Sequence, residues 1–385
     1  MRGRVTPFTP EYVPAVRAFN GRLAAAGVPW RFPETAVPDW LPRTADAPVW
    51  QEYFVLVDDG AVRGACALKR QTATLGGIPQ RVGSFYWPLS EGAVDRAFAP
   101  VATQLLRAAH ALEPLLFLIG MGGAHTPTAR LVRALRWRLA PVPFYFRALH
   151  PVRFLRRLSY MRKRAVVARA LDIAAITGFG WLGLTLAQGA RRALTRRDRT
   201  ARAEPVSRFG AWADTIWAAS AAGCSFAGVR DASALNATYP SRDDGMLRLC
   251  VSRDGTPAGW AVVQDVRLEA SEHFGDLRVG TIVDCCAPAH DATAVIALST
   301  AHLAERGVDL IITNQSHWAW RRALVANGFL RGPTSWMLAL SPELGARIGV
   351  LDPAGRALHL NRGDGDGPWG MGLAAPAGTA LPRAS

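Results

Sequence analysis

The sequence predicts an α/β (or α+β) protein made of two consecutive domains, each a mixed β-sheet flanked by helices. Two observations support this prediction. Strand and helix patterns alternate along most of the chain, and one order of elements (helix, hairpin, strand, helix, strand, helix, strand) occurs twice. The chain has 385 residues, of which 50% are hydrophobic, so two separate cores can form.

The first copy of this order is expected within residues 1–150. The segment YFVLVDDGAVRGACALKRQTATL predicts a hairpin, because Asp59-Gly60 supplies a two-residue turn between runs of alternating apolar residues. VGSFYWPL and PLLFLIGMGG predict two more strands. Helices are expected between and after these strands, the last of them beginning at Thr126 and Pro127.

The second copy is expected within residues 206–345, with its hairpin at Asp254-Gly255. Near its end, VDLIITN predicts a strand and SHWAWRRALVANG a helix. We expect Gly328 to end this helix in the left-handed conformation and Phe329 to enter the core. Trp318 and Trp320 lie two positions apart on the helix, so at most one of them should be buried.

Residues 151–205 connect the two copies and carry much of the positive charge. They contain 13 basic and 3 acidic residues, 10 of the net charge of +15. The charges surround an uncharged run, 173–190, that predicts a buried interdomain helix, a helix in the interface of an anionic membrane, or a single span. Nearly equal basic flanks argue against the span. Nucleic acid is the least favoured partner, since no binding motif accompanies the charge.

The cysteines and the two ends of the chain give three further expectations. No pair has C-x-x-C spacing, which predicts free thiols at Cys66, Cys224, Cys250, Cys285 and Cys286. The N-terminal segment lacks the apolar core of a secretory signal, so we expect a cytoplasmic protein, peripheral on the inner face of the membrane if the connector binds lipid. Residues 346–385 are rich in Gly, Pro and Ala and are expected to form a loose tail.

The repeated order of elements, with Asn314 after a strand and a helix closing in Gly328-Phe329, resembles the GNAT superfamily of acyl-CoA N-acyltransferases. Two such domains in one chain are similar to tandem GNAT proteins and to Fem-type aminoacyl transferases. The resemblance covers roughly residues 206–345 and, more faintly, 1–150.

This resemblance implies an acyl-CoA donor, such as acetyl-CoA, and an amine acceptor. It places Asn314, Ser316 and Trp318 among the residues that would bind the donor. Two features of the family are missing. Members have a glycine-rich loop that binds the pyrophosphate, whereas the second copy has CCAPAHDATAV at this place and the first copy has only Gly92. Many members also have a tyrosine that acts as a general acid, and Leu324 stands at that position.

Asp284 and His290 are the candidate catalytic residues. Asp284 lies near the end of a predicted strand, where GNAT enzymes often place a base, although a strand-end aspartate also commonly caps a turn. His290 precedes Asp291, which is more simply interpreted as a helix N-cap than as a catalytic group. Glu91 and Glu272 lie in equivalent loops of the two copies and are lesser candidates.

Two glycine-rich stretches have both structural and functional interpretations. GMGG at 120–123 could bind an anion with its backbone N–H groups, or form only a tight turn. GDGDG at 363–367 has some features of a metal loop, but it lacks the ligand spacing and closing glutamate of an EF-hand, so a solvated turn is favoured. No metal ion is expected from the sequence.

Two functions follow from these patterns. The first is transfer of an acyl or aminoacyl group to an amine, on a sugar or an envelope glycan precursor. The second is a non-catalytic binding or assembly role in envelope polysaccharide production. The missing glycine loop and tyrosine favour the second function, and Asp284 favours the first.

Overall fold

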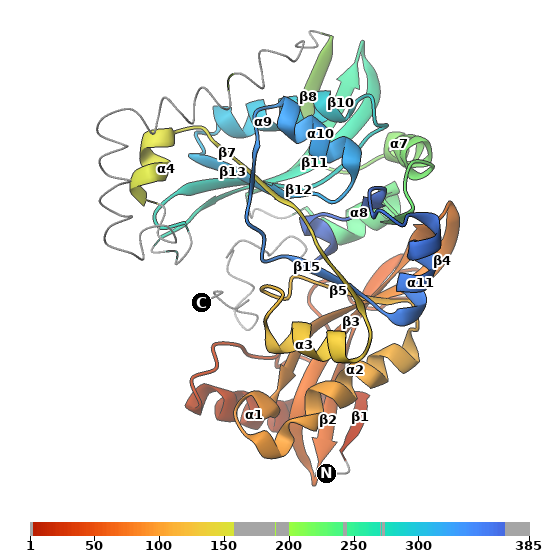
Figure 1. Ribbon diagram of the computed structural model, residues 1–385, viewed down its shortest axis with the longest axis vertical. Helices are drawn as coiled ribbons and strands as arrows, with labels where there is room; N and C mark the ends of the chain where they lie inside the picture. Colours follow the sequence, from red (N-terminus) through yellow and green to blue (C-terminus); the bar gives the residue numbers. More distant parts are fainter. Residues whose placement is uncertain are drawn as a thin grey trace.

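The computed structural model describes residues 3–157, 189, 200–241, 245–269, 271 and 274–365. It contains two mixed β-sheets, here called sheet A and sheet B, which lie toward opposite ends of the long axis of the molecule (Figure 1). Sheet A lies near the N-terminus, and sheet B lies beyond it.

Most of sheet A and its helices come from the first part of the chain. The elements of this first part of the chain are β1 (Arg4–Pro7), α1 (Val13–Ala25), β2 (Val49–Asp58), β3 (Ala61–Leu75), β4 (Ile78–Ser90), α2 (Pro100–Leu112), β5 (Leu116–Ile119), α3 (Pro127–Ala134), β6 (Arg138–Pro141), β7 (Phe144–Ala148) and α4 (Pro151–Arg157). Short 3-10 turns lie at η1 (Pro10–Tyr12), η2 (Glu91–Ala93) and η3 (Arg96–Phe98).

The second part of the chain repeats this order and then returns to sheet A. Its elements are β8 (Ala201–Val206), α7 (Ala211–Ala221), β9 (Phe226–Gly228), α8 (Ala232–Thr238), β10 (Met246–Arg253), β11 (Thr256–Arg267), β12 (Arg278–Cys286), α9 (Ala292–Glu305), β13 (Leu310–Asn314), α10 (Trp318–Ala326), β14 (Leu330–Gly332), β15 (Met337–Leu340), α11 (Pro342–Leu351), β16 (Leu358–His359) and η5 (Arg362–Asp364).

The two sheets have the same strand order. Sheet A runs β1-β2-β3-β4-β5-β15-β6, with β9 and β16 added beside β3, and sheet B runs β8-β10-β11-β12-β13-β7-β14. One pair on each main path is parallel, β4 with β5 and β12 with β13. Helices pack on both faces of each sheet. The prediction of two mixed sheets of one topology is therefore confirmed.

Each sheet takes one strand from the other part of the chain, which the sequence patterns did not predict. β7 follows β6, yet it pairs in sheet B between β13 and β14, with Phe146 opposite Ile312. β15 follows β14, yet it pairs in sheet A between β5 and β6, with Leu338 opposite Ile119. Neither sheet is complete without the other half, so the two halves must fold together.

The two predicted hairpins form as expected. Asp59 and Gly60 connect β2 and β3 with φ of 48° and 75°, and Asp254 and Gly255 connect β10 and β11 with φ of 49° and 80°. Two consecutive positive φ values are typical of the tight turn whose twist matches antiparallel strands. Asp and Gly tolerate this conformation better than most residues.

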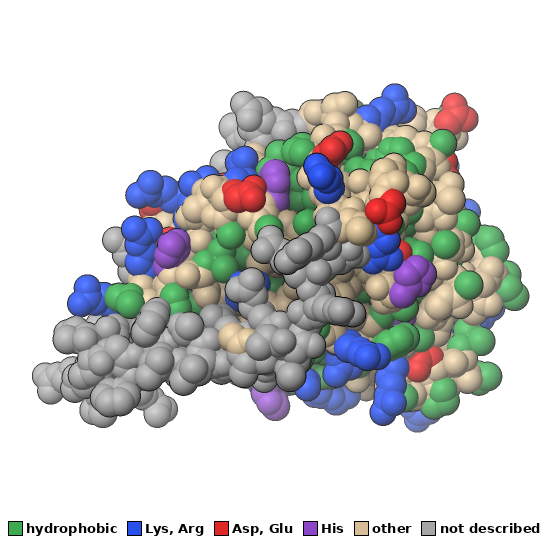
Figure 2. Space-filling model, turned by 90° about the horizontal axis from the view of Figure 1, so that it is seen from above, with side chains coloured by type: hydrophobic (Ala, Val, Ile, Leu, Met, Phe, Trp, Pro, Cys, Tyr) green, Lys and Arg blue, Asp and Glu red, His purple; other side chains and the backbone are tan. Residues whose placement is uncertain are grey.

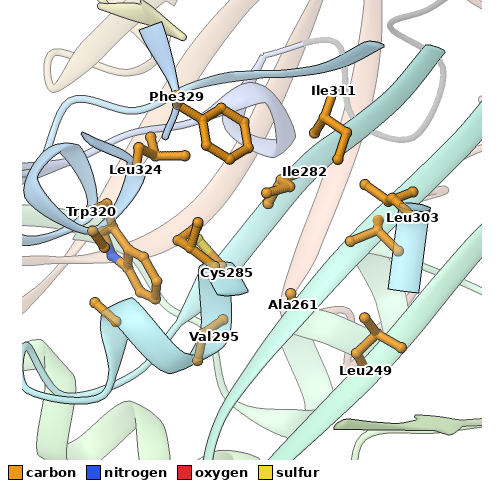
Figure 3. Close-up of a cluster of buried hydrophobic side chains, with 14 of the residues drawn as sticks. Leu249, Ala261, Ile282, Cys285, Val295, Leu303, Ile311, Trp320, Leu324 and Phe329 are labelled. Carbon is orange, nitrogen blue, oxygen red and sulfur yellow. The ribbon is translucent and has the colours of Figure 1, made fainter. Parts of the chain in front are cut away.

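The helix α10 packs as its sequence predicts. Gly328 has φ of 81° and ends the helix, and Phe329 turns into the core with no exposed surface. Trp320 is buried, whereas Trp318 is 44% exposed, as expected for two positions that face different sides of a helix. Figure 3 shows this cluster, in which α10 and α9 cover sheet B through Trp320, Leu324, Phe329, Val295, Leu303, Ile282 and Cys285.

The cysteines are free, as predicted, and all but Cys250 are buried. Cys285 packs in the cluster beneath α9 and α10, and Cys286 packs in the cluster beneath α7 and α8. These neighbours on β12 therefore point to opposite faces of sheet B, as successive strand residues do.

The expectation of a loose tail is wrong for residues 346–365. These residues include most of α11, the strand β16 and the turn η5. Ile348 and Leu360 have no exposed surface, and β16 pairs with β9 in parallel. Apolar residues at 348, 358 and 360 supply this burial in spite of the glycine-rich composition around them.

The connector has only its first residues within the structure. Residues 151–157 form α4, and Phe154 stacks on Phe146 of β7 with ring centroids 5.8 Å apart. The uncharged run 173–190 lies outside the described residues except for Gly189. Within the described ranges, no helix has the length and apolarity needed to cross a membrane. On the face seen in Figure 2, Lys and Arg side chains lie in separate groups with Asp and Glu between them.

Candidate functional site

Each sheet has one place where two parallel strands diverge. In sheet A the pairing of β4 with β5 ends at Ser84–Phe117, and β4 then continues to Ser90. In sheet B the pairing of β12 with β13 ends at Thr281–Ile312, and β12 continues to Cys286. Backbone groups beyond such a point lose their parallel partner and can bond to another group.

In sheet B the C-terminal segment of the chain bridges the diverging strands. Asn361 forms a β-bridge with Gln315, which follows β13, and its Nδ2 donates to Oδ1 of Asp284 on β12 over 2.5 Å. Ser316 holds the same segment, because its Oγ accepts from the Leu360 N–H at 2.8 Å and its own N–H donates to the Leu360 carbonyl at 3.0 Å. The interval beside β12 is therefore closed by the protein itself.

A buried guanidinium links this segment to β12. Arg230, which follows β9, donates from Nε to Oδ1 of Asp284 at 3.0 Å and from an Nη to Oδ2 of Asp364 at 2.7 Å. Its other Nη donates to the Gly228 carbonyl at 3.0 Å. All three charged side chains are buried. Two carboxylates on one guanidinium leave a single negative charge, which is surrounded by hydrogen-bond donors.

Asp284 accepts hydrogen bonds on both of its oxygens. Oδ1 receives the Arg230 Nε, the Asn361 amide and the backbone N–H of Cys285, and Oδ2 receives the Tyr239 hydroxyl at 2.8 Å. A carboxylate has about four acceptor positions. Asp284 is also only 3% exposed, so its hydrogen-bonded carboxylate is not open to a substrate, which fits a positioning role better than that of a base.

Burial and neighbouring charges together shift the pKa values of this cluster. It raises the pKa of Asp284 above its usual value, although the charge of Arg230 opposes the shift. Burial and the negative charge of Asp284 raise the pKa of the Tyr239 hydroxyl well above its usual value, so the phenol stays a donor. Burial alone would lower the pKa of Arg230, but Asp284 and Asp364 outweigh it and raise that pKa.

Lys69 extends the cluster into sheet A. It lies on β3, is 4% exposed, and donates from Nζ to the Asp364 carbonyl at 3.0 Å. Its ammonium also lies 5.8 Å from the ring centroid of Trp40. Trp40 in turn donates from Nε1 to the Thr238 carbonyl at 3.0 Å. These contacts join the two halves around the turn η5.

His290 and Asp291 lie away from this cluster of contacts. The His290 ring is largely exposed and contacts Asp291 at 3.1 Å. Asp291 is the N-cap residue of α9, as predicted, although its side chain makes no capping hydrogen bond. It pairs instead with Arg253 of β10 at 2.5 Å.

The predicted donor-binding residues serve different purposes in the structure. Asn314 is buried, accepts from Arg362 at 3.3 Å and donates to the Val142 carbonyl at 3.3 Å. Ser316 binds the C-terminal segment, as described above. Trp318 lies on the outer side of α10. The structure therefore does not bring these three side chains together around one open interval.

Glu91 is the buried carboxylate at the corresponding strand end of sheet A. It accepts from Arg22 at 2.6 Å and from Arg63 at 3.1 Å. Burial would raise its pKa, but the hydrogen bonds and charges of Arg22 and Arg63 outweigh that effect and hold the pKa below its usual value. Gly92 follows in a tight turn, where a Cβ would contact the backbone of Phe98 and Ala99.

The diverging strands of sheet A end in strained and glycine-rich backbone. Trp87 lies in a bulge of β4 with φ of 52°, which is unusual for a bulky residue, and its buried Nε1 has no hydrogen-bond partner among the described residues. After β5 the chain turns through Gly120, Gly122 and Gly123, all with positive φ. Thr126 then caps α3, as predicted, by accepting from the Ala129 N–H at 3.2 Å.

Sequence reasoning missed most of the buried cluster, namely Lys69, Arg230, Tyr239, Asn361 and Asp364. The interpretation of GDGDG as a solvated turn is wrong for Asp364, which is buried and paired with Arg230. One pattern was informative. Lys69 stands inside an apolar strand pattern, where an unpaired charge would be costly, so a buried partner was to be expected. Glu272 lies outside the described residues.

In the described part of the chain, no three His, Cys, Asp or Glu side chains are placed to hold a metal ion.

The sequence matches no protein-family model and no curated protein sequence. Among solved structures, it is similar to a conserved protein from Enterococcus faecalis V583 described as a probable N-acyltransferase, with 11% identity, a TM-score of 0.48, and 89% of this chain and 74% of that chain covered. It is also similar to Saccharomyces cerevisiae N-myristoyltransferase with bound myristoyl-CoA and inhibitors, with 10% identity, a TM-score of 0.49, and coverage of 88% and 79%.

A third similar structure is a tandem GNAT protein from the clavulanic acid biosynthesis pathway. Its identity to this chain is 12%, the TM-score is 0.44, and the match covers 88% of this chain and 98% of that one.

Proposed function

We propose that the protein is an N-acyltransferase that uses an acyl-CoA donor, and that the donor binds where β4 and β5 diverge in sheet A. The observation that carries this proposal is the difference between two equivalent intervals. Asn361 bridges the one in sheet B. The one in sheet A is bordered by the bulged end of β4 and by the glycine turn after β5.

The backbone of β4 suits the pantetheine arm of such a donor. This arm contains two amide groups in an extended chain, so it can bond to strand backbone in the way that another strand would. The donor thioester would then lie near Trp87, on the face of sheet A that also carries Lys69. An amine attacks the thioester carbonyl, the carbon–sulfur bond breaks, and the amine proton ends on the CoA thiol.

Asp284 has a positioning role in this proposal rather than the role of a base. Its oxygens are occupied by Arg230, Tyr239, Asn361 and the Cys285 N–H. The ion pair keeps residues 361–364 against β12, and Lys69 contacts that turn from the side of sheet A. His290 receives no role, because its ring is exposed and bonds only to the neighbouring residue among the described side chains.

Calorimetry with acetyl-CoA and with a longer acyl-CoA tests the proposal. We expect one donor molecule per chain, because Asn361 bridges the interval in sheet B. Trp87→Ala should weaken binding, whereas Trp318→Ala, a tryptophan change in the other half, should leave it intact. Trp87→Phe serves as the second variant if the alanine variant loses stability. Absence of binding by the folded parent protein would instead favour a non-catalytic binding or assembly role.

A further inference from the structure

Three aliphatic side chains are exposed together at the end of sheet A where the β3–β4 hairpin turns. Val350 is 83% exposed, Ile78 is 62% exposed and Leu351 is 48% exposed. Ile78 begins β4 after the Gly76-Gly77 turn, and Leu351 ends α11. The two elements are neighbours, since a Cβ on Gly76 would lie 2.9 Å from the Leu351 side chain. Figure 1 shows β4 and α11 side by side at the periphery. We call these three residues the hairpin–α11 tip.

Arginine side chains surround the hairpin–α11 tip. Arg347, one turn before Leu351, is exposed and donates to Oε1 of Gln80 at 3.4 Å. Arg138 donates to the Pro353 carbonyl at 3.3 Å, and Arg356 is exposed five residues after Leu351. Among the described residues, none of these three guanidinium groups forms an ion pair, so their charges remain available.

Two carboxylates near the tip point inward. Asp352 follows Leu351 but is buried, and it accepts from the Ser225 hydroxyl and from the backbone of Arg356 and Ala357. Glu113 is also buried, and it neutralises Arg81 at 3.1 Å. Glu343 on α11 is exposed but pairs with His110 at 2.7 Å. Among the described residues, the outward charges around the tip that lack an ion-pair partner are therefore those of the arginines.

We propose that the hairpin–α11 tip docks on the surface of an anionic lipid bilayer. Aliphatic side chains on a protruding tip can enter the boundary between headgroups and acyl chains, while the arginines stay among the phosphates. The net charge of +15 adds long-range attraction to such a surface. A narrow protrusion buries little area against a second copy, and the clustered positive charges would repel. This proposal does not depend on the acyltransferase activity.

Cosedimentation of the full chain with vesicles tests the proposal. Vesicles of phosphatidylcholine alone and with phosphatidylserine are compared at low and at high salt. We expect binding to the phosphatidylserine vesicles, weakened by salt. The double variant Ile78→Asp with Val350→Asp should reduce the partition coefficient by about tenfold or more, and Arg347→Gln with Arg356→Gln should reduce it mainly at low salt.

Val37→Asp is the matched control, because Val37 is 65% exposed but lies outside the tip. It should bind vesicles as the parent protein does. Unchanged binding by the Ile78/Val350 variant would overturn the proposal and assign any lipid contact to another surface. Equal binding to both vesicle types would also overturn it. The proposal would likewise be overturned if the Ile78/Val350 variant lost self-association in ultracentrifugation while its vesicle binding stayed unchanged.

Discussion

Sheets A and B share one strand order but treat their diverging strands differently. In sheet B the interval beyond Thr281 is bridged by Asn361, and the Asp284 carboxylate is paired with the buried Arg230. In sheet A the bulge at Trp87 and the glycine turn after β5 border the equivalent interval. One scaffold thus supports a packed interior in one half and a candidate binding site in the other.

The difference arises from the segment that follows α11. Residues 358–364 pack onto β9 and against β12, whereas β7 leads into α4 and the connector. The strand exchange makes this possible, since β15 returns the chain to sheet A just before α11. The segment after α11 therefore gives two sheets of one strand order different surroundings at their diverging strands.

The largest effect is expected for Arg230→Met, which leaves Asp284 and Asp364 buried without their common cation. Breaking a buried ion pair on one side costs about 3–5 kcal/mol. Chemical denaturation of parent and variant measures this loss of unfolding free energy. Arg96→Met, an exposed arginine of η3, is the control and should change little. A loss for Arg230→Met as small as that of the control would show that the cluster contributes no stability.

Asp284→Asn should destabilise the protein by about 2–3 kcal/mol, because an asparagine amide places a donor against the donors of Tyr239 or Asn361. The affinity for acyl-CoA should stay close to that of the parent, since the proposed site lies in sheet A. Calorimetry and denaturation on the same preparations check both expectations. If turnover per folded molecule fell with stability unchanged, Asp284 would act as a base after all.

The sequence was informative about the fold wherever the relevant interactions are local. Asp59-Gly60, Asp254-Gly255 and Gly328 each require a backbone conformation that few residue types adopt, so their turns could be located. The strand exchange could not be predicted, because β7 and β15 have ordinary apolar strand patterns. Which sheet such a strand joins depends on packing between residues far apart in the chain.

The site was less predictable than the fold, for a related reason. Asp284 lies 54 residues after Arg230, and Asp364 lies 80 residues after Asp284. Only the folded chain brings the three side chains together. Asp364 lies in a glycine-rich stretch that resembles solvated turns. Its Gly363 is needed because a Cβ there would overlap the Tyr239 hydroxyl, a contact that composition does not show.

Glu91→Gln tests the buried carboxylate of sheet A, and we expect a loss of about 1–2 kcal/mol at neutral pH. The pKa of Glu91 is lowered in the folded protein. Its stabilising contribution is therefore present above the unfolded value of about 4.3 and is lost as the pH falls through the lowered folded value. Denaturation at several pH values should show the parent and variant curves converging in acid.

Glu34→Gln is the control for this pH series, because the Glu34 pair with Arg17 is exposed. Exposed pairs contribute about 0–1 kcal/mol, so its pH dependence should be weak. A difference between Glu91→Gln and the parent that stayed constant into acid would contradict the lowered pKa.

The smallest effect is expected for Trp318→Ala. Trp318 is 44% exposed at the start of α10, so truncation removes little packing, and changes at such surface positions usually alter stability by about 0.5 kcal/mol or less. Its affinity for acyl-CoA should equal that of the parent in calorimetry. The resemblance to GNAT proteins placed this residue among the donor-binding ones. The variant therefore distinguishes a donor site in sheet B from the proposed site in sheet A. Weakened donor binding here, with Trp87→Ala unaffected, would move the site to sheet B and require Asn361 to leave the interval between β12 and β13.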